Sequence, residues 1–258
     1  PFDFFHINSL DPEPNGDLLV SARNTWTIYT IDPTTGQVLN EIGGRQSTYK
    51  QAQGAATAYQ HDATLLPNGT ISVFDNGGTP FAHSQSRALI LQVNAQNNTV
   101  SAVEQFEHAS PLKAGSQGDV QLLSNGNLFV GWGGAPYFSE YTPSGALVFD
   151  GHVSSLAQSY RVYRFPWSAT PTTPPAIAAT AGTGHKLTVY ASWNGATTVA
   201  AWRVLAGTSA TALKPVLSAP DGGFETTIPT SSVGPDVEVQ ALASSGAVLG
   251  TSKLLTSP

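Results

Sequence analysis

The chain has 258 residues, of which 40% are hydrophobic and only 11% are charged, and its formal net charge is −6. It has no cysteine, which excludes a disulfide framework and a thiolate metal site. It also has no cluster of Lys and Arg, which argues against a nucleic-acid partner, and no apolar run approaches the roughly 18 residues of a membrane-spanning helix.

The remaining composition is typical of a turn-rich β-protein with an uncharged polar surface. Glycine (25) and proline (18) are frequent, and Met and Cys are both absent. Because both sulfur side chains oxidise, their absence suits an oxidising, extracellular setting, and we expect a secreted protein. The sequons at Asn68 and Asn97 would matter only in a eukaryotic secretory host.

The first part of the chain contains a threefold repeat. Each repeat has an apolar run, an Asn-Gly turn, a second run, a connection, and then two further runs joined by a short turn. An Asn-Gly pair between alternating apolar residues is a strong hairpin signal, because both positions accept a positive φ. The repeats and their turns are 7–44 (Asn15-Gly16), 61–106 (Asn68-Gly69) and 118–153 (Asn125-Gly126).

Four short antiparallel strands per repeat predict the blade of a β-propeller. The stretch 159–167 predicts one further strand, so residues 1–167 would hold about three blades and a closing strand. A ring needs at least four blades. We therefore expect the missing blades to come from residues before Pro1 or from a second polypeptide.

The rest of the chain predicts a separate domain. Residues 168–176, SATPTTPPA, predict a stiff Pro/Thr linker. Residues 177–258 contain about seven short apolar runs, a spacing typical of an immunoglobulin- or fibronectin-like β-sandwich. Trp193 and Trp202 are its expected core aromatics, and nothing in this part indicates catalysis.

Two of the six histidines have a distinctive position, because His6 and His61 each begin the leading strand of a repeat. In a propeller the innermost strands line the central channel, so such side chains converge there. The same channel would receive Asn8 and Arg23, although Arg23 alone could simply cap a strand end. The other four histidines are expected in loops: His83, His108, His152 and His185.

These four polar residues, His6, Asn8, Arg23 and His61, suit an anionic, oxygen-rich group. A neutral histidine can attack such a group while the others hold its oxygens. They include no acid, which fits a glycoside hydrolase poorly, and two histidines without a third ligand make a weak metal site. From position alone, a polar residue at the end of a strand is the favoured interpretation of His61.

Several stretches resemble the arylsulfotransferase (ASST) family of six-bladed β-propeller enzymes. They are DFFHINSLDPEPNGDLLVSARNTWTIYTID and QHDATLLPNGTISVFDNGG, followed by SRALILQVN. The stretches GDVQLLSNGNLFVGWGG and SYRVYRFPW resemble the secreted actinobacterial and fungal branch of the family. The resemblance covers about residues 1–167.

The resemblance implies transfer of a sulfuryl group from a phenolic sulfate ester to a phenol acceptor, without a nucleotide donor or other cofactor. It implies that His61 is the transiently sulfated nucleophile, and that His6, Asn8 and Arg23 complete the catalytic site. We further expect Arg87 and Asn76 to bind the substrate. The alternative is a catalytically inactive secreted propeller that acts as a binding or structural protein.

Overall fold

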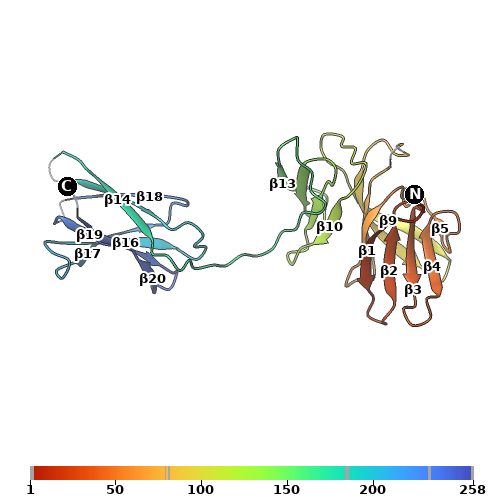
Figure 1. Cartoon of the computed structure of the whole chain (residues 1–258), viewed down its shortest axis with the longest axis horizontal. Helices are drawn as coiled ribbons and strands as arrows, with labels where there is room; N and C mark the ends of the chain where they lie inside the picture. The colour runs from red at the N-terminus through yellow and green to blue at the C-terminus, as the bar shows by residue number, and fades with distance from the viewer. Residues whose placement is uncertain (1–2, 79, 81, 184–185, 232–233, 257–258) are drawn as a thin grey trace. The chain divides into compact units, whose positions relative to one another are not determined.

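The computed structural model describes residues 3–78, 80, 82–183, 186–231 and 234–256. The chain is all-β, and the described residues form strands and turns without a helix. It divides into two compact units, Pro1–Arg164 and Phe165–Pro258 (Figure 1). Across the described ranges there is accordingly no helix that is long and apolar enough to cross a membrane.

The first unit contains three sheets, one for each predicted repeat. In each sheet four consecutive strands pair in chain order, which confirms the predicted four-strand repeat. Gly16, Gly69 and Gly126 have positive φ values of +96°, +81° and +85°, whereas Asn15, Asn68 and Asn125 do not, so the expected positive φ is confirmed only for the glycine of each turn. The strands are β1 (Ile7–Pro12), β2 (Leu18–Ala22), β3 (Thr27–Ile31) and β4 (Val38–Gly43); β6 (His61–Leu65), β7 (Ile71–Asp75), β8 (Arg87–Asn94) and β9 (Thr99–Phe106); and β10 (Asp119–Leu122), β11 (Leu128–Gly131), β12 (Tyr137–Tyr141) and β13 (Leu147–His152).

The structure departs from the sequence prediction in two places. A short strand, β5 (Lys50–Gln51), pairs in parallel with β9 in a connection where no strand was expected. The strand expected over 159–167 is not formed. Part of this segment is instead held alongside β10 by side chains, because Val162 N–H donates to Asp119 Oδ1 (2.9 Å) and Arg164 N–H donates to the Gln121 side chain (2.8 Å).

The leading strands of the first unit are joined in the same way. Side-chain oxygens at the start of one sheet accept backbone N–H groups from the segment that leads the next sheet. Ser9 Oγ accepts from Ala63 N–H (3.0 Å), and Asp62 Oδ2 accepts from Val120 N–H (3.0 Å). These contacts hold β1, β6 and β10 in sequence and place their first residues close together.

Two apolar clusters fill the first unit. One joins the first and second sheets and includes Leu19, Ile28 and Leu89. The other joins the second and third sheets and includes Phe74 and Trp132, whose rings meet edge to face at 5.8 Å. The strand β7 serves both clusters, because its alternate side chains face the two neighbouring sheets.

The second unit contains two sheets, ordered β14-β15-β18 and β17-β16-β19-β20, with β21 paired to β19. Their buried residues form one cluster that includes Trp193 and Trp202, which confirms the predicted core aromatics. His185 lies outside the described residues. The strands are β14 (Ala176–Ala181), β15 (Leu187–Ser192), β16 (Ala201–Gly207), β17 (Lys214–Pro220), β18 (Thr226–Thr230), β19 (Asp236–Leu242), β20 (Val248–Thr251) and β21 (Leu255–Thr256).

Candidate active site

His61, the first residue of β6, is almost completely buried, with 2% of its surface exposed. Its Nδ1 lies 2.7 Å from Asn76 Oδ1 and 3.1 Å from the Tyr59 carbonyl oxygen. Its Nε2 lies 3.2 Å from the backbone nitrogen of Gln117, which donates to it. Every nitrogen of the ring therefore has a partner.

Asn76 fixes which ring nitrogen of His61 carries the proton. The amide nitrogen of Asn76 donates to the carbonyl oxygens of Ala114 (2.9 Å) and Gln117 (2.8 Å). Its oxygen must therefore face His61 and can only accept. His61 consequently donates from Nδ1 and keeps its lone pair on Nε2, the arrangement that a nucleophilic imidazole needs.

Burial also fixes the charge of His61. It lowers the pKa of His61 to about 4 and outweighs the hydrogen bonds to Asn76 and Tyr59, which raise this pKa. The positive charge of Arg23 and the neighbouring His6 lower the pKa further. His61 is therefore neutral at pH 7, with its Nε2 lone pair intact.

Arg23 and His6 lie beside His61, as the sequence predicted. The ring centroids of His6 and His61 are 6.4 Å apart, and the backbone N–H of Arg23 donates to the His6 carbonyl (2.9 Å). The Arg23 guanidinium lies over the Tyr59 ring, 4.6 Å from its centroid, and donates to the Gly115 carbonyl (2.9 Å). A cation and two imidazoles therefore converge at this position.

Asn8 also lies at the site, but its side chain is bonded to the backbone. Its amide nitrogen donates to the Gln60 carbonyl (2.8 Å), and its amide oxygen accepts from Asp62 N–H (3.3 Å). These bonds hold the residues on either side of His61. The geometry therefore favours a positioning role for Asn8 over direct contact with a substrate.

The two expected substrate-binding residues, Arg87 and Asn76, have other partners. Arg87 Nε donates to the buried Asp75 carboxylate (2.9 Å), whose other oxygen accepts from Ala58 N–H (2.9 Å). The rest of its guanidinium bonds Gln105 and the Ala56 carbonyl. The side-chain amide of Asn76 bonds His61 and two carbonyl groups. The side chains of Arg87 and Asn76 are therefore both bonded to other residues of the protein.

Unusual backbone conformations gather at this position. Among the described residues, six that are not glycine have a positive φ, and five of them surround His61 or contact its neighbours. Such conformations cost about 1–3 kcal/mol each and concentrate at functional sites. The five are His6 (60°), Trp26 (59°), Tyr59 (57°), Asp62 (58°) and Gln117 (65°).

Sequence reasoning missed the two neighbours of His61. Gln60 is fully buried, and its amide nitrogen donates to the Ala22 carbonyl (3.2 Å) of the first sheet. Asp62 forms an ion pair with Arg161, although burial raises its pKa. The signal was present, because Gln60-His61-Asp62 recurs in the next repeat as Gln117-Gly118-Asp119.

Asp119 is the most perturbed acid of this group. Burial raises its pKa to about 7, more than the bond from Val162 N–H lowers it. Its Oδ2 is buried without a hydrogen-bond partner, which a protonated carboxyl tolerates better than an ionised one. Within the described ranges, no group of three or more His, Asp or Glu side chains is arranged to hold a metal ion.

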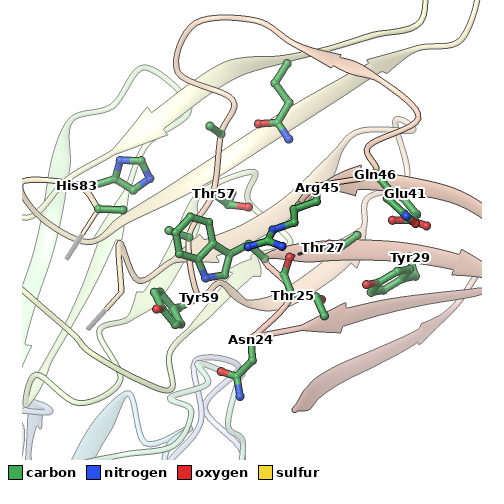
Figure 2. Close-up of a pocket in the computed structure, with 16 residues that line it drawn as sticks. Asn24, Thr25, Thr27, Tyr29, Glu41, Arg45, Gln46, Thr57, Tyr59 and His83 are labelled. Carbon is green, nitrogen blue, oxygen red and sulfur yellow. Dashed lines mark hydrogen bonds between the residues drawn. The ribbon is translucent and has the colours of Figure 1, made fainter. Parts of the chain in front are cut away.

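A pocket of about 750 Å³ is lined by residues of the first sheet and by the segment that leads to His61, including Tyr59 (Figure 2). Its wall includes Trp26, whose ring centroid is 5.0 Å from that of Tyr59. His61 does not line this pocket. Tyr59 nevertheless links the two, because its carbonyl oxygen lies 3.1 Å from His61 Nδ1.

The fold and the site together define an all-β protein of repeated four-stranded sheets that converge on a buried neutral histidine. A family model for Arylsulfotransferase (ASST) matches residues 1–154. The chain belongs to the arylsulfotransferase (ASST) family. No curated protein matches the chain.

The solved structures that are similar to this chain share little sequence with it. A protein of unknown function from Bacteroides caccae is 13% identical, with a TM-score of 0.41, and the match covers 99% of this chain and 86% of that one. Hydrazine synthase from Kuenenia stuttgartiensis is 12% identical (TM-score 0.41; coverage 96% and 66%). The PQQ-bound aldose sugar dehydrogenase from Streptomyces coelicolor is 14% identical (TM-score 0.39; coverage 97% and 80%).

Proposed function

We propose that the protein is a sulfotransferase that moves a sulfuryl group from a phenolic sulfate ester to a phenol through a sulfohistidine at His61. Membership of the arylsulfotransferase family supports this reaction class. The observation that carries the proposal for this chain is the fixed tautomer of His61. Asn76 holds the proton on Nδ1, and burial keeps the ring neutral.

The reaction would proceed in two displacements. The lone pair of His61 Nε2 attacks the sulfur, the bond from sulfur to the aryl oxygen breaks, and the phenolate leaves. The oxygen of the acceptor phenol then attacks the same sulfur, the S–N bond breaks, and the electron pair returns to Nε2. The proton of the acceptor passes to water, and the departed phenolate takes up a proton from water in exchange. While Nε2 is sulfated the ring is cationic, and the bonds from Nδ1–H to Asn76 and Tyr59 stabilise that charge.

Arg23 and His6 would serve the transferring group. A loose transition state places negative charge on the sulfuryl oxygens and on the leaving oxygen, so fixed positive groups dominate catalysis. Arg23 is held by Gly115, Asn24 and the Tyr59 ring. It therefore needs little rearrangement when the charge develops.

The bond from Gln117 N–H to His61 Nε2 must be released before attack, because it uses the same lone pair. At 3.2 Å it is at the long end of the range for such bonds, and its loss costs about 1 kcal/mol. The released N–H is then available to a sulfuryl oxygen. The same feature favours the alternative function, a secreted binding or structural protein, because the imidazole is closed off in this state.

We further propose that the first unit is part of a β-propeller completed by other blades, which a second polypeptide supplies. Apolar side chains on its outer sheets support this, because Ile7 (56%) and Phe149 (48%) are strongly exposed, and large exposed apolar patches mark interaction surfaces. Native mass spectrometry of the isolated protein should find that second polypeptide. A first unit that is monomeric with a fully closed ring would contradict the proposal.

The second unit would be a fibronectin-like sandwich that acts as a spacer in a secreted protein. Its two sheets share one core, which supports independent folding. Limited proteolysis should cut within 168–176 and release a folded tail. A tail that unfolds on release would contradict this assignment.

The enzyme assignment is tested with p-nitrophenyl sulfate as donor. Release of p-nitrophenol should accelerate when a phenol acceptor is added, since the acceptor discharges the sulfohistidine. His61→Ala should lower the rate by at least about 10⁴-fold, as expected for loss of a nucleophile. His152→Ala, which removes an exposed histidine of the same unit, should have no effect; absence of acceptor-dependent release across a panel of phenyl sulfates would favour the binding protein.

A further inference from the structure

The pocket beside Tyr59 has the size and the lining of a ligand site. Its volume of about 750 Å³ falls within the roughly 300–1,000 Å³ of small-molecule pockets. Tyr29, Tyr59 and Trp26 supply aromatic surface, and Thr25 and Thr57 supply hydroxyl groups. Such a mixture of aromatic walls and a few polar groups is typical of a site for a ring-containing ligand.

The aromatic pair of this pocket is built at the expense of backbone strain. Trp26 and Tyr59 both have positive φ values, 59° and 57°, which is exceptional for bulky residues. Two glycines make room for them. A Cβ at Gly78 would collide with the Tyr59 ring, and one at Gly43 would collide with the Trp26 carbonyl oxygen. Backbone strain of this kind clusters at functional sites, where the surrounding structure holds it in place.

Arg45 supplies a positive charge without a protein partner. Its side chain is exposed, and it forms no ion pair or hydrogen bond with another of the residues that the structure describes. Figure 2 shows the Arg45 side chain reaching into the pocket toward Thr57, away from Glu41, the acidic residue of the lining. A guanidinium in that position is free to pair with an anion.

From these features we infer that the pocket binds an aromatic anion, with the ring against Trp26 and Tyr59 and the anionic group on the Arg45 guanidinium. This site is distinct from His61, which does not line the pocket. It adjoins the buried histidine through Tyr59, whose carbonyl accepts from His61 Nδ1 and whose ring carries Arg23. The inference does not require that His61 accept a sulfuryl group.

The test uses benzenesulfonate, an aromatic anion that has no ester oxygen and cannot be turned over. Titration calorimetry on the full protein should show saturable binding. Cyclohexanesulfonate has the same charge without the aromatic ring and should bind about 10-fold more weakly, because it lacks the ring interactions. Benzenesulfonate also resembles the sulfate ester proposed at His61, so the Arg45→Gln variant below identifies the pocket, whereas turnover of p-nitrophenyl sulfate tests the sulfotransferase assignment separately.

Variants then locate the site. Arg45→Gln should weaken benzenesulfonate binding by about 10-fold or more, the effect of losing one charge-assisted contact. The matched control, Lys50→Gln, removes an equal charge from an exposed residue nearby that does not line the pocket, and should change affinity by less than about two-fold. No saturable binding, or equal effects of the two substitutions, would overturn the inference.

Discussion

The second and third sheets begin with nearly the same tripeptide, Gln60-His61-Asp62 in one and Gln117-Gly118-Asp119 in the other. In both, the aspartate accepts a backbone N–H from the segment that follows: Val120 for Asp62 (3.0 Å) and Val162 for Asp119 (2.9 Å). The two sheets differ at the middle residue. The repeat therefore supplies the scaffold twice, and the candidate chemistry resides in one copy.

Gly118, at the start of the third sheet, must be a glycine because a side chain of the second sheet packs against it. Gly118 has a φ of +107°, and a Cβ there would collide with the Phe74 ring. Because Gly118 lets the chain pass so close, the preceding Gln117 can direct its N–H to His61 Nε2. The copy without the histidine thus completes the surroundings of the copy that has it.

The largest expected effect is a loss of stability when Gly118 is replaced by a residue with a side chain. Gly118→Ala should lower the free energy of unfolding by about 3–5 kcal/mol, because it combines overpacking with a strained φ. Gly126→Ala is the control, since its φ is +85° and the nearest atom to the added Cβ, Pro143 Cγ, lies at 3.7 Å, an ordinary van der Waals contact. It should cost only about 1–2 kcal/mol; equal costs in urea denaturation would contradict the steric argument.

The next effect concerns the tautomer of His61. Asn76→Leu should lower the sulfuryl transfer rate by about 10²–10⁴-fold, as loss of a tautomer-fixing partner does elsewhere, with little change in KM. Asn76→Asp keeps an oxygen near Nδ1, and its negative charge should raise the pKa of His61. The acidic limb of the rate profile, expected near pH 4, should then move to higher pH. If the acidic limb of Asn76→Asp lies at the same pH as in the unmodified protein, Asn76 has only a structural role.

Arg23 and Arg87, the two arginines that the sequence predicted at the site, should differ in their effect on kinetics. Arg23→Gln should lower the transfer rate by about 10²–10³-fold, the range for one transition-state donor. Arg87→Gln should instead lower the free energy of unfolding by about 3 kcal/mol, because it removes the arginine charge that pairs with the buried Asp75 carboxylate. Its rate per folded molecule should be unchanged. A rate loss in Arg87→Gln as large as that in Arg23→Gln would restore Arg87 to the substrate site.

The smallest effect is the pH dependence of stability. The pKa of Asp119 rises from 3.8 to about 7 in the folded protein, so the folded state holds the extra proton and this group's contribution to stability falls between about pH 4 and pH 7. The lowered pKa of His61 has the opposite sign, since stability is lost as pH falls from 6.5 toward 4.

Asp119→Asn should therefore make the unfolding free energy rise more steeply with pH over this window, because it removes a contribution that opposes that of His61. Denaturant midpoints between pH 4 and pH 7.5 measure this slope. Glu104→Gln, which removes an exposed carboxyl group of the same unit, is the control and should leave the slope as it is. An unchanged slope in Asp119→Asn would show that this carboxyl titrates normally.

The fold could be predicted where the signal is local. Asn-Gly turns and alternating apolar residues identified the three four-stranded repeats and the tail with Trp193 and Trp202 in its core. The segment 159–167 has the same alternation, but its backbone finds no neighbouring strand and bonds to side chains of β10 instead. Alternation predicts an extended chain and cannot supply a partner.

The sequence predicted where the site lies better than it predicted what each of its residues does. His6, Arg23 and His61 come together as expected, because they occupy matching ends of leading strands. The partners of Asn76 and Arg87 could not be predicted, since Ala114, Gln117 and Ala56 approach them only after the sheets have packed. A polar residue in a candidate motif can bind a substrate or hold the protein, and only tertiary contacts separate the two.

The central claim is that His61 carries the sulfuryl group, and peptide mass spectrometry tests it most directly. The protein is incubated with p-nitrophenyl sulfate without acceptor, quenched in alkali because the N–S bond is acid-labile, and digested. The account predicts one added sulfuryl group on the peptide that contains His61, which disappears when phenol is supplied and is absent in His61→Ala. Turnover without that label, or turnover that survives His61→Ala, would contradict it.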